Sequence, residues 1–422
     1  MILDGLFGDA EIAALIGDQA QVVAIVRFEQ ALARVQARMG IIPDTAARAI
    51  AAAIPPDPAA LIATTARAGI AAQAVVAVLK STLGDTAPYL HFGATSQDAQ
   101  DSAAALQWAA VLDVLAARIA ALDAALAVKA ADYADQPIPA RTRFQIAAPT
   151  TLGAKIAVWR APLRRHLDRL AELRPRLLTV SLFGAAGTGA ALADMAAVRV
   201  ALAAELGLAD APIPTHATRD AQAELGAWLA LVSGTLGKIG TDLILLGQSE
   251  IGEVSAGTGG GSSTMPQKSN PVAAEALVTL ARLNAGAVGT LFQALVHAQE
   301  RDGAAMAIEW LTLPDMAIRT GAALRLAQSL VDTLRANPDR IKATFDADQG
   351  AMLAEAAGFL LARDMPRPDA LAIVAQALQS GRPLADALTD LAPGRDWHRA
   401  LDPAANTGAA GRIARINQHI DQ

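Results

Sequence analysis

The segment with the clearest chemical content is a glycine- and serine-rich stretch at residues 257–271, GTGGGSSTMPQKSNP. Four of its first five residues are glycine, and because glycine costs backbone entropy on folding, a functional reason for keeping them is indicated. Such a segment exposes many backbone N–H groups, and Lys268 adds a full positive charge. The composition predicts a mobile loop able to close over a negatively charged ligand.

A helix is expected to begin directly after this loop. Pro271 suits the first position of a helix, and Asn270 suits its N-cap. The N-terminus of a helix carries partial positive charge, which adds to the attraction for an anion. The alternative is a flexible linker with an ordinary capping asparagine, although such linkers rarely join two long patterned helices.

Long helices must position this loop. Apolar residues recur at intervals of three and four in the segments 97–132, 220–250 and 271–299. A sustained heptad pattern puts one apolar seam on each helix and is typical of left-handed bundles. A helix of 30 residues is about 45 Å long, so we expect packing against other subunits. A purely structural bundle is the alternative, and the polar loops between the helices argue against it.

Shorter helices are expected on either side of these long ones, among them 18–39 and 71–83. The pair Asn337-Pro338 marks a natural boundary. The sequence therefore predicts an all-α fold in three parts. These are an N-terminal helical domain (1–96), a central long-helix bundle (97–337) and a short C-terminal helical domain (338–422).

The composition excludes several classes of protein and partner. With 422 residues, of which 53% are hydrophobic and 18% charged, the chain is not disordered, and its length favours two or three domains. A net charge of −6 without a basic block argues against nucleic acid as a partner. No uncharged apolar run reaches the roughly 18 residues that span a membrane, so no membrane partner is expected.

Neither a metal nor a cofactor is expected. The six histidines include no pair at i, i+4, and no phosphate- or dinucleotide-binding fingerprint appears. The absence of cysteine excludes disulfides and thiolate nucleophiles and fits a reducing compartment. The N-terminus has no signal-peptide pattern, so we expect a cytoplasmic protein.

The ten residues 261–270, GSSTMPQKSN, resemble the signature Gly-Ser-Ser-x-Met-Pro-x-Lys-x-Asn of the fumarase/aspartase superfamily at every fixed position. The resemblance implies a homotetramer whose sites are shared between subunits. It also implies that Ser262 is the general base that removes a proton α to a carboxylate, while Lys268 and Asn270 bind that carboxylate. A serine hydroxyl works as a base only where N–H groups and a cation stabilise its alkoxide.

Residues 91–98, HFGATSQD, resemble a second region of the superfamily, His-x-Gly-x-Thr-Ser-x-Asp. The resemblance implies that Thr95 and Ser96 donate hydrogen bonds to a substrate carboxylate and that His91 meets it as a cation or donor. A lone histidine in a glycine-containing loop is more often a solvated turn residue. The Thr-Ser-Gln-Asp tail favours a binding site.

A third region, RTRFQIAAPTT at residues 141–151, resembles the run Arg-Thr-His-x-x-His-Ala-x-Pro-Thr-Thr of adenylosuccinate lyases. The two histidine positions hold Arg143 and Ile146 here. Ile146 cannot transfer a proton, which counts against adenylosuccinate lyase and argininosuccinate lyase. Arg141, Arg143 and Thr150 remain candidates for binding substrate, and Arg143 either binds a third carboxylate or indicates a related tricarboxylate as the substrate.

Further stretches resemble the bacterial carboxymuconate cycloisomerases of this superfamily: 170–178, 183–188, 215–220, 293–303 and 309–315. This resemblance implies reversible lactonisation of a small tricarboxylate in protocatechuate breakdown. Such a trianion requires cationic ligands. Arg301 is the candidate for a catalytic role, and His216 and Arg219 are candidates for binding.

Two alternatives stay open. The first is another lyase of the superfamily, with adenylosuccinate lyase foremost. The second is a non-catalytic, crystallin-like structural protein on the same fold. The intact set of Ser262, Lys268 and Asn270 disfavours the second, because a chain freed from catalysis has no need of a glycine-rich loop.

Overall fold

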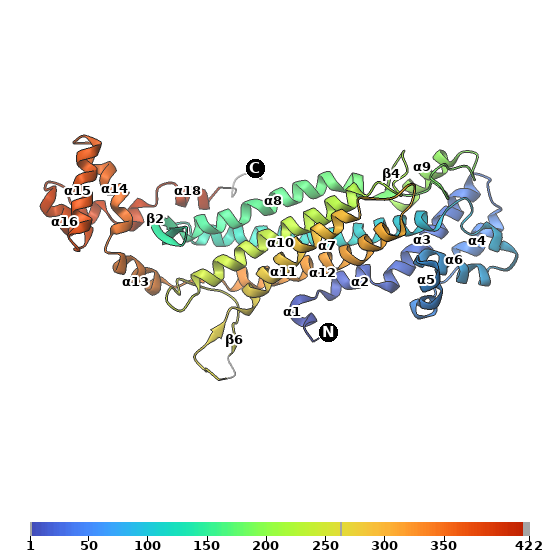
Figure 1. Cartoon of the computed structure of the whole chain (residues 1–422), viewed down its shortest axis with the longest axis horizontal. Coiled ribbons are helices and arrows are strands. Elements are labelled where there is room, and N and C mark those ends of the chain that lie inside the picture. Colours follow the sequence, from blue (N-terminus) through green and yellow to red (C-terminus); the bar gives the residue numbers. More distant parts are fainter. Residues whose placement is uncertain (1, 262–263, 417–422) are drawn as a thin grey trace. The chain divides into compact units, whose positions relative to one another are not determined.

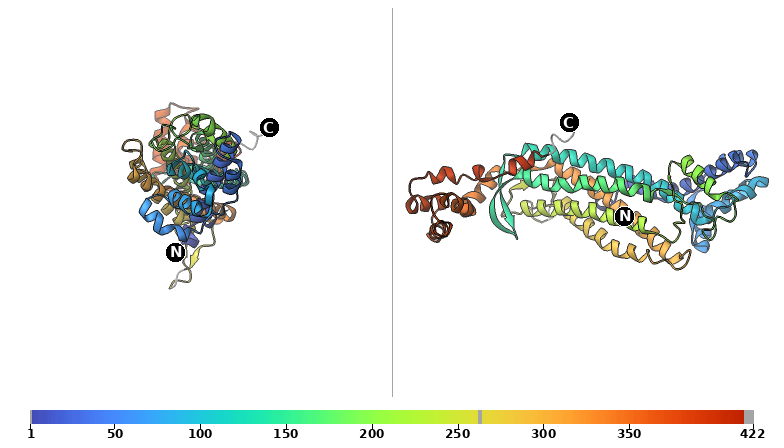
Figure 2. Two further views of the ribbon diagram at one scale, coloured as in Figure 1. Left: turned by 90° about the vertical axis from the view of Figure 1, so that its right-hand side faces the viewer. Right: turned by 90° about the horizontal axis from the view of Figure 1, so that it is seen from above.

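A computed structural model describes residues 2–261 and 264–416 of the chain. It is 68% helical with few short strands, which confirms the all-α prediction. Five long helices dominate: α7 (Ser96–Asp132), α8 (Leu152–Leu177), α10 (Asp220–Leu246), α11 (Val272–Gln293) and α12 (Gly303–Thr333) (Figure 1). The same helices can be followed by colour in the two views of Figure 2.

The predicted ends of the long helices are partly confirmed. The helix expected over 220–250 ends at Leu246. The helix expected to reach residue 299 ends at Gln293. The chain reverses there because the carboxylate of Asp302 accepts hydrogen bonds from the N–H groups of Ala298 and Ala304, at 3.2 and 2.9 Å. The sequence did not single out α12 as a long helix, and Pro314 in its interior is a residue that usually breaks helices.

The heptad seams of α7 and α10 are buried as predicted, whereas Leu295, in the pattern predicted for 271–299, is 38% exposed. The seam residues of α7 (Leu115, Ile119, Leu122, Leu126) and of α10 from Leu225 to Ile239 (Leu225, Leu229, Val232, Leu236, Ile239) are 0% exposed. Asn284 interrupts the seam of α11 and is equally buried. Its Nδ2 donates to Ser233 Oγ of α10 at 2.8 Å and to Thr320 Oγ1 of α12 at 3.1 Å. A buried polar contact of this kind fixes the register of neighbouring helices.

Residue contacts divide the chain into two compact units. The first comprises Met1–Ile119, His166–Gly234 and Thr279–Leu324, and the second comprises Ala120–Arg165, Thr235–Val278 and Arg325–Gln422. The long helices contribute residues to both units. The three-domain division at residues 96 and 337 describes successive stretches of sequence and stays a prediction.

The N-terminal helices of the first unit enclose their own core, in which Phe28 and Ile25 are fully buried. The carboxylate of Glu205 on α9 pairs with Arg34 and Arg38 of α3 at 2.7 and 2.8 Å. The helices are α1 (Asp4–Phe7), α2 (Ala10–Ile16), α3 (Asp18–Arg38), α4 (Asp44–Ala51), α5 (Ile62–Ala68), α6 (Ala71–Thr82) and α9 (Met195–Leu206).

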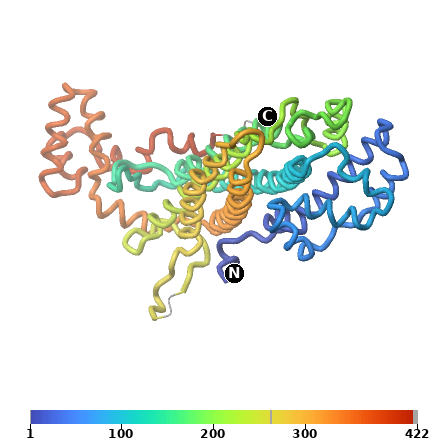
Figure 3. The backbone as a smooth tube through the Cα atoms, turned by 45° about the vertical axis from the view of Figure 1, so that its right-hand side comes forward, coloured from blue at the N-terminus to red at the C-terminus, as the bar shows by residue number. Residues whose placement is uncertain are grey.

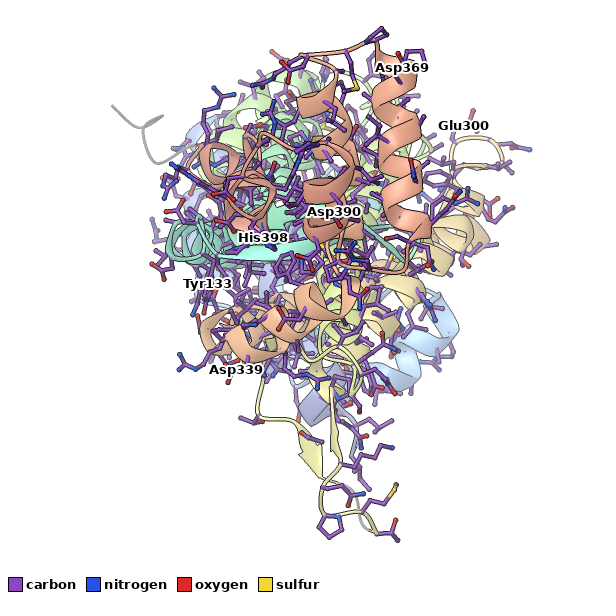
Figure 4. All side chains as sticks on the ribbon, turned by 90° about the vertical axis from the view of Figure 1, so that its left-hand side faces the viewer. Tyr133, Glu300, Asp339, Asp369, Asp390 and His398 are labelled. Atoms are coloured by element: carbon purple, nitrogen blue, oxygen red, sulfur yellow. The ribbon has the colours of Figure 1, made fainter. Side chains whose placement is uncertain are left out.

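The C-terminal helices of the second unit pack around Trp397, which is 1% exposed. Asp369, Asp390 and His398 lie on the outside of this cluster (Figure 4). The helices are α13 (Pro338–Asp348), α14 (Ala354–Leu361), α15 (Arg367–Gln379), α16 (Leu384–Leu391) and α17 (Trp397–Ala400), whereas α18 (Ala410–Ala414) contributes no residue to this cluster.

The strands in the described residues form four two-stranded pairs, three antiparallel and one parallel. The antiparallel pairs are β1 (Pro137–Thr142) with β2 (Gln145–Thr151), β5 (Val254–Ser255) with β8 (Arg335–Ala336), and β6 (Gly260–Gly261) with β7 (Ser269–Asn270). The parallel pair is β3 (Thr179–Val180) with β4 (Ala209–Asp210). Two of these hairpins carry candidate site residues.

Two helices, α10 and α11, are long and apolar enough to cross a membrane by length and composition alone. Half of the apolar window of α10 and a third of that of α11 are buried inside the chain. Core helices of bundles pass the same test, so this finding is weak evidence for a membrane span.

Candidate active site

The loop of residues 91–98 leads into α7 through a side-chain cap. The N–H group of Thr95 donates to Asp98 Oδ2 at 3.0 Å, and the Thr95 carbonyl accepts the first helical hydrogen bond, from Ala99. This arrangement corresponds to half of a capping box, in which an acidic residue three positions into the helix satisfies the N-cap. It fixes the positions of Thr95 and of Ser96, the first residue of the helix.

Asp98 organises the loops around this helix end. It is fully buried, and its Oδ1 accepts hydrogen bonds from Phe183 N–H at 3.0 Å and Ser181 Oγ at 2.9 Å, while Oδ2 also accepts from Gly184 N–H at 2.9 Å. Burial alone would raise the pKa of this carboxyl, but the hydrogen bond from His216 and the backbone donors hold the pKa below its usual value. Asp98 is therefore an ionised anchor.

His216 contacts both Asp98 and Ser181 in the buried interior. Its Nε2 lies 2.8 Å from Asp98 Oδ1 and 3.2 Å from Ser181 Oγ. In a Ser-His-Asp catalytic triad the serine and the carboxylate contact opposite ring nitrogens. Here both contact the same nitrogen, so the three residues form a structural cluster. A direct substrate contact for His216 stays a prediction.

His91 is held in the left-handed backbone region, with a φ of 62°. Its Nδ1 lies 2.6 Å from Oε1 of Glu29, whose side chain is 0% exposed. Burial alone would lower the pKa of His91, but the Glu29 carboxylate outweighs this effect and raises the pKa above its usual value. The other carboxylate oxygen of Glu29 is buried without a hydrogen-bond partner, so Glu29 strongly favours the imidazolium form.

Arg301 is an exposed cation that contacts the start of α7. Its Nε donates to Gln97 Oε1 at 2.7 Å, and its Nη1 donates to Thr95 Oγ1 at 3.3 Å. Gln97 is fully buried and is itself fixed through a bond from its Nε2 to the carbonyl of His216, at 2.9 Å. The structure thus brings the predicted residues Arg301 and Thr95 into contact. Among the described residues, no carboxylate pairs with the guanidinium of Arg301.

Arg219, by contrast, is saturated by protein acceptors. Its guanidinium is 3% exposed and pairs with Asp101 of α7 at 2.9 Å and Glu309 of α12 at 2.5 Å. Burial would lower the pKa of Arg219, yet the two carboxylates raise it further above its usual value. Arg219 therefore links α7 to α12 through two buried ion pairs. Its contact with substrate stays a prediction.

In the second unit, the β1–β2 hairpin carries the third predicted region. Arg141 makes two hydrogen bonds of 2.7 Å to the carboxylate of Glu253, which is 0% exposed. Thr150 lies opposite Ile138 in the strand pair and is half-buried. Ile146 lies opposite Arg141. Arg141 is thus oriented by a buried carboxylate, and its substrate contact stays a prediction.

The tip of this hairpin is strained. Thr142 pairs with Gln145, so Arg143 and Phe144 form a two-residue turn, and their φ angles are 51° and 68°. Glycine or asparagine normally occupies such positions because other side chains adopt positive φ only at a cost. Phe144 is nevertheless 79% exposed. Strain of this kind tends to persist where function requires it.

Among the described residues of this glycine-rich segment, the strands β6 and β7 pair as the two arms of a hairpin, which the sequence did not predict. The hairpin is the yellow segment that extends away from α10 and α11 (Figures 1 and 3). A Cβ at Gly259 would lie 1.9 Å from Ser269 Oγ, and Gly259 has a φ of 69°. The glycine-rich sequence therefore has a structural reason in addition to the functional one.

The helix after this hairpin begins one residue later than predicted. The first residue of α11 is Val272, and the carbonyl of Pro271 accepts the N–H of Glu275 at 2.9 Å. Pro271 thus takes the N-cap position that was predicted for Asn270. The shift has a physical reason, because the backbone of Asn270 pairs with Gly260 in the hairpin.

Lys268 is exposed, and none of the described residues forms an ion pair with its ammonium group. Ser262 and its neighbour Ser263 lie outside the described residues. The role of Ser262 as general base, the roles of Lys268 and Asn270 in binding, and the closing of this loop over a ligand all stay predictions.

A family model described as lyase matches residues 14–285, more than half of the chain. The chain is 40% identical to the 3-carboxy-cis,cis-muconate cycloisomerase of Pseudomonas aeruginosa, over 97% of this chain and 94% of that protein. This chain belongs to the fumarase/aspartase superfamily of lyases. The family predicted from residues 261–270 is therefore confirmed.

A solved structure has the same fold as nearly the whole chain. The 3-carboxy-cis,cis-muconate lactonizing enzyme from Pseudomonas putida superposes with a TM-score of 0.92 and 36% identity, over 98% of this chain and 97% of that one. A further superfamily relative, trans-aconitate decarboxylase 1 of Mycosarcoma maydis, is 34% identical over 92% of this chain and 81% of that protein. The chain is thus an enzyme of the lyase class.

Three residues that organise the site had been quoted in the motifs without a role. Asp98 anchors the loop before α7, Gln97 orients Arg301, and Glu309 holds Arg219. The spacing of Thr95 and Asp98 is a capping-box pattern that could have identified Asp98. No sequence signal singles out Gln97 or Glu309, because their partners lie ninety or more residues away along the chain.

Proposed function

We propose that this chain interconverts 3-carboxy-cis,cis-muconate and 4-carboxymuconolactone, a reaction of protocatechuate breakdown through the β-ketoadipate route. The 40% identity to the cycloisomerase of P. aeruginosa, over 97% of this chain, carries the proposal. Ile146 supports it, because adenylosuccinate lyases usually carry a proton-transferring histidine at the corresponding position.

The reaction sets clear physical demands on the site. Lactonisation joins a carboxylate oxygen to a carbon of the diene, and a proton adds to the carbon α to another carboxylate. A trianion and one proton thus give a dianionic lactone, with no change in oxidation level. The enzyme must bind three carboxylates, stabilise the charge that develops on one of them, and deliver the proton.

Ser262 is the proposed proton-transfer group. In the direction of ring opening it removes the proton α to the carboxylate, and in lactonisation it returns that proton. Lys268 and Asn270 bind the same carboxylate, so that the charge of the aci-carboxylate intermediate is stabilised as it forms. The exposed position of Lys268, without an ion pair to the described residues, supports this role because its charge is free for a ligand.

The remaining carboxylates meet the other predicted residues. Arg301 and the hydroxyls of Thr95 and Ser96 bind one of them, with His91 alongside as an imidazolium. The anchoring of Arg301 by Gln97 supports this assignment, because an oriented guanidinium loses little entropy when it binds a carboxylate. His216 and Arg219 support these residues indirectly, because the carbonyl of His216 accepts a hydrogen bond from Gln97 and Arg219 pairs with Asp101 of α7.

Arg141, Arg143 and Thr150 of the β1–β2 hairpin are the proposed ligands of a further carboxylate. Arg143 is exposed at the strained tip, and no carboxylate of the described residues pairs with it. A free guanidinium at this position suits a ligand with an extra carboxylate.

We further propose a cytoplasmic homotetramer in which different subunits contribute to each site. Large apolar side chains remain exposed on the long helices, including Leu311, which is 78% exposed, and Leu231, Leu283 and Phe292. Exposed apolar surface on helices of this length favours association with further copies of the chain.

A second candidate is another tricarboxylate substrate. Arg143 in place of the histidine motivates it, and the relative named trans-aconitate decarboxylase supports it, because aconitate also carries three carboxylates. The test is a panel in which purified protein is mixed separately with 3-carboxy-cis,cis-muconate, trans-aconitate and adenylosuccinate. We expect rapid loss of the diene ultraviolet absorbance with the first alone. Turnover of another member of the panel instead would transfer the proposal to that substrate.

A further inference from the structure

A cavity of about 280 Å³ opens beside the β1–β2 hairpin in the second unit. The side chains of Arg143 and Phe144 at the hairpin tip, Lys155 of α8, and Asp242 and Gln248 at and beyond the end of α10 line it. Its volume suits a small organic acid. Lys155 was not singled out from the sequence, since nothing distinguishes a single lysine within a long helix.

The charges around this cavity leave a positive excess. Arg141, at the edge of the cavity, is neutralised by Glu253. Asp242 accepts hydrogen bonds from Trp159 Nε1, at 2.6 Å, and from the ammonium of Lys238. Both carboxylates of this region are thus already paired.

Two cations remain without a counter-charge. Among the described residues, neither the guanidinium of Arg143 nor the ammonium of Lys155 has an ion-pair or hydrogen-bond partner. Lys155 is only partly exposed. Leaving a cation half-buried without a partner is unfavourable for the free protein.

We propose that Lys155 binds a carboxylate of the substrate in this cavity, together with Arg143, and so favours a tricarboxylate over the matching dicarboxylate. The substrate class rests on the proposed function, whereas the cavity and its unpaired cations do not.

The protonation of Lys155 supports this assignment. Burial lowers the pKa of its ammonium group, and although the Asp242 carboxylate opposes this effect, the cations of Lys238 and Arg141 add to it. A carboxylate bound beside Lys155 supplies the missing counter-charge, so ligand binding stabilises the charged lysine. The ammonium group of Lys155 thus lacks a counter-charge in the free protein and gains one when the ligand binds.

The test compares two unreactive ligands of the full-length protein by calorimetry, tricarballylate and glutarate. Tricarballylate is glutarate with one additional carboxylate on its central carbon, so the pair isolates the third carboxylate. The variants are Lys155→Met, which keeps the stem and removes the charge, and Lys155→Arg, which keeps the charge. Lys342→Met is the matched control, because Lys342 pairs with Asp346 on the surface of α13 and neither residue lines the cavity.

We expect Lys155→Met to weaken tricarballylate binding about tenfold or more and glutarate binding less than about threefold. We expect Lys155→Arg to retain most of the preference and Lys342→Met to retain all of it. The thermal midpoint of Lys155→Met should equal or exceed that of the wild type, because the change removes an unpaired buried charge. A lysine with a merely structural role would instead give a lower midpoint and an unchanged preference.

The inference is overturned if the wild type does not bind tricarballylate at millimolar concentration. It is also overturned if Lys155→Met leaves the preference unchanged, or if Lys342→Met abolishes it equally. Loss of the preference in Lys155→Met, in a protein that does not turn over 3-carboxy-cis,cis-muconate, supports the site while the proposed function fails. If the wild type turns over 3-carboxy-cis,cis-muconate but Lys155→Met keeps the preference for tricarballylate, the proposed function is supported and the Lys155 site is overturned.

Discussion

Buried carboxylates orient the exposed groups of the candidate site. Asp98 and Glu29 are both nearly or fully buried, and each fixes a residue that the sequence had assigned to substrate binding. Arg301 depends in the same way on the buried amide of Gln97. Because these supporting groups are already hydrogen-bonded, the site residues need little rearrangement before they meet a ligand.

Replacing Arg301 with methionine removes an exposed cation and leaves the buried groups in place. We expect kcat/KM for 3-carboxy-cis,cis-muconate to fall roughly 10–100-fold, the loss typical of one charge-assisted hydrogen-bonded contact. The thermal midpoint should change little, because Arg301 is exposed. Arg382→Met, which removes an exposed ion pair with Asp390, is the control and should keep full activity. Unchanged kinetics in the Arg301 variant would remove that residue from the site.

The pair of His91 and Glu29 predicts a pH dependence of stability. The pKa of His91 is raised above its value of 6.5 in the unfolded chain. The stabilisation is therefore fully present below about pH 6.5 and is lost as the pH rises through the folded-state pKa. Thermal midpoints of the wild type and of His91→Asn, compared at fixed protein concentration from about pH 5.5 to pH 8.5, should converge as the pH rises. Parallel profiles for the two proteins would contradict the pairing.

At the scale of elements, two hairpins and the ends of long helices present the candidate residues. The β1–β2 hairpin presents Arg143 on a strained turn, and the β6–β7 hairpin presents Lys268. Helices give these hairpins fixed points of attachment, since α8 follows the first and α11 follows the second. Rigid helices with short presenting loops are a common way to hold binding groups.

Glycines in α10 provide a test of the helix packing. A Cβ at Gly240 would lie 2.6 Å from the carbonyl oxygen of Ala274 on α11, whereas a Cβ at Gly234 would meet nothing within 4 Å. We expect Gly240→Ala to lower the free energy of unfolding by about 2 kcal/mol. The matched change Gly234→Ala should raise it by about 0.5–1 kcal/mol, because alanine is the better helix former. Urea unfolding at equal protein concentration measures both. Similar values for the two variants would contradict the close approach of α10 and α11.

Heptad patterns and one dense motif were enough to predict the helices and the family. The seam of α7 and the start of α10 needed only local spacing, because a helix repeats its environment every seven residues. The β6–β7 hairpin and the clamp on Arg219 could not be predicted in that way. The clamp depends on Asp101 and Glu309, which lie far from Arg219 along the chain. The hairpin strands are only two residues long and carry no alternating pattern that predicts a strand.

The role of Lys155 illustrates the limit for the site itself. Its significance depends on the absence of a partner, which only packing can reveal. Ile146 was more informative, because an apolar residue at a position where related lyases carry histidine excludes proton transfer whatever the packing. The absence of a proton-transferring histidine could therefore be predicted from the sequence, whereas the lack of a counter-charge beside Lys155 could not.

At the scale of the whole molecule, the proposed active sites depend on the association of several copies of the chain. The exposed apolar residues of α10, α11 and α12 favour contact with other copies, and the proposed sites draw residues from different subunits. A shared site makes activity a property of the assembly, so that each chain can be defective in a different way and still contribute to a working site.

Complementation between inactive variants tests this proposal. Ser262→Ala and Arg301→Met, each poorly active alone, should recover a fraction of wild-type turnover after they are unfolded and refolded together. Recovery is expected because some sites then combine an intact Ser262 from one chain with an intact Arg301 from another. Native mass spectrometry confirms that mixed assemblies form. Mixed tetramers without recovered activity would show that each site belongs to one chain.

The most direct test of the central claim follows the diene absorbance of 3-carboxy-cis,cis-muconate with three proteins, the wild type, Ser262→Ala and Ser263→Ala. The two serines are neighbours in the same segment, so the second variant controls for any general effect of the substitution. We predict rapid loss of absorbance with the wild type, a rate at least about 10³-fold lower with Ser262→Ala, and substantial activity with Ser263→Ala. Full activity in Ser262→Ala, with the same assembly as the wild type, would contradict the assignment of the base.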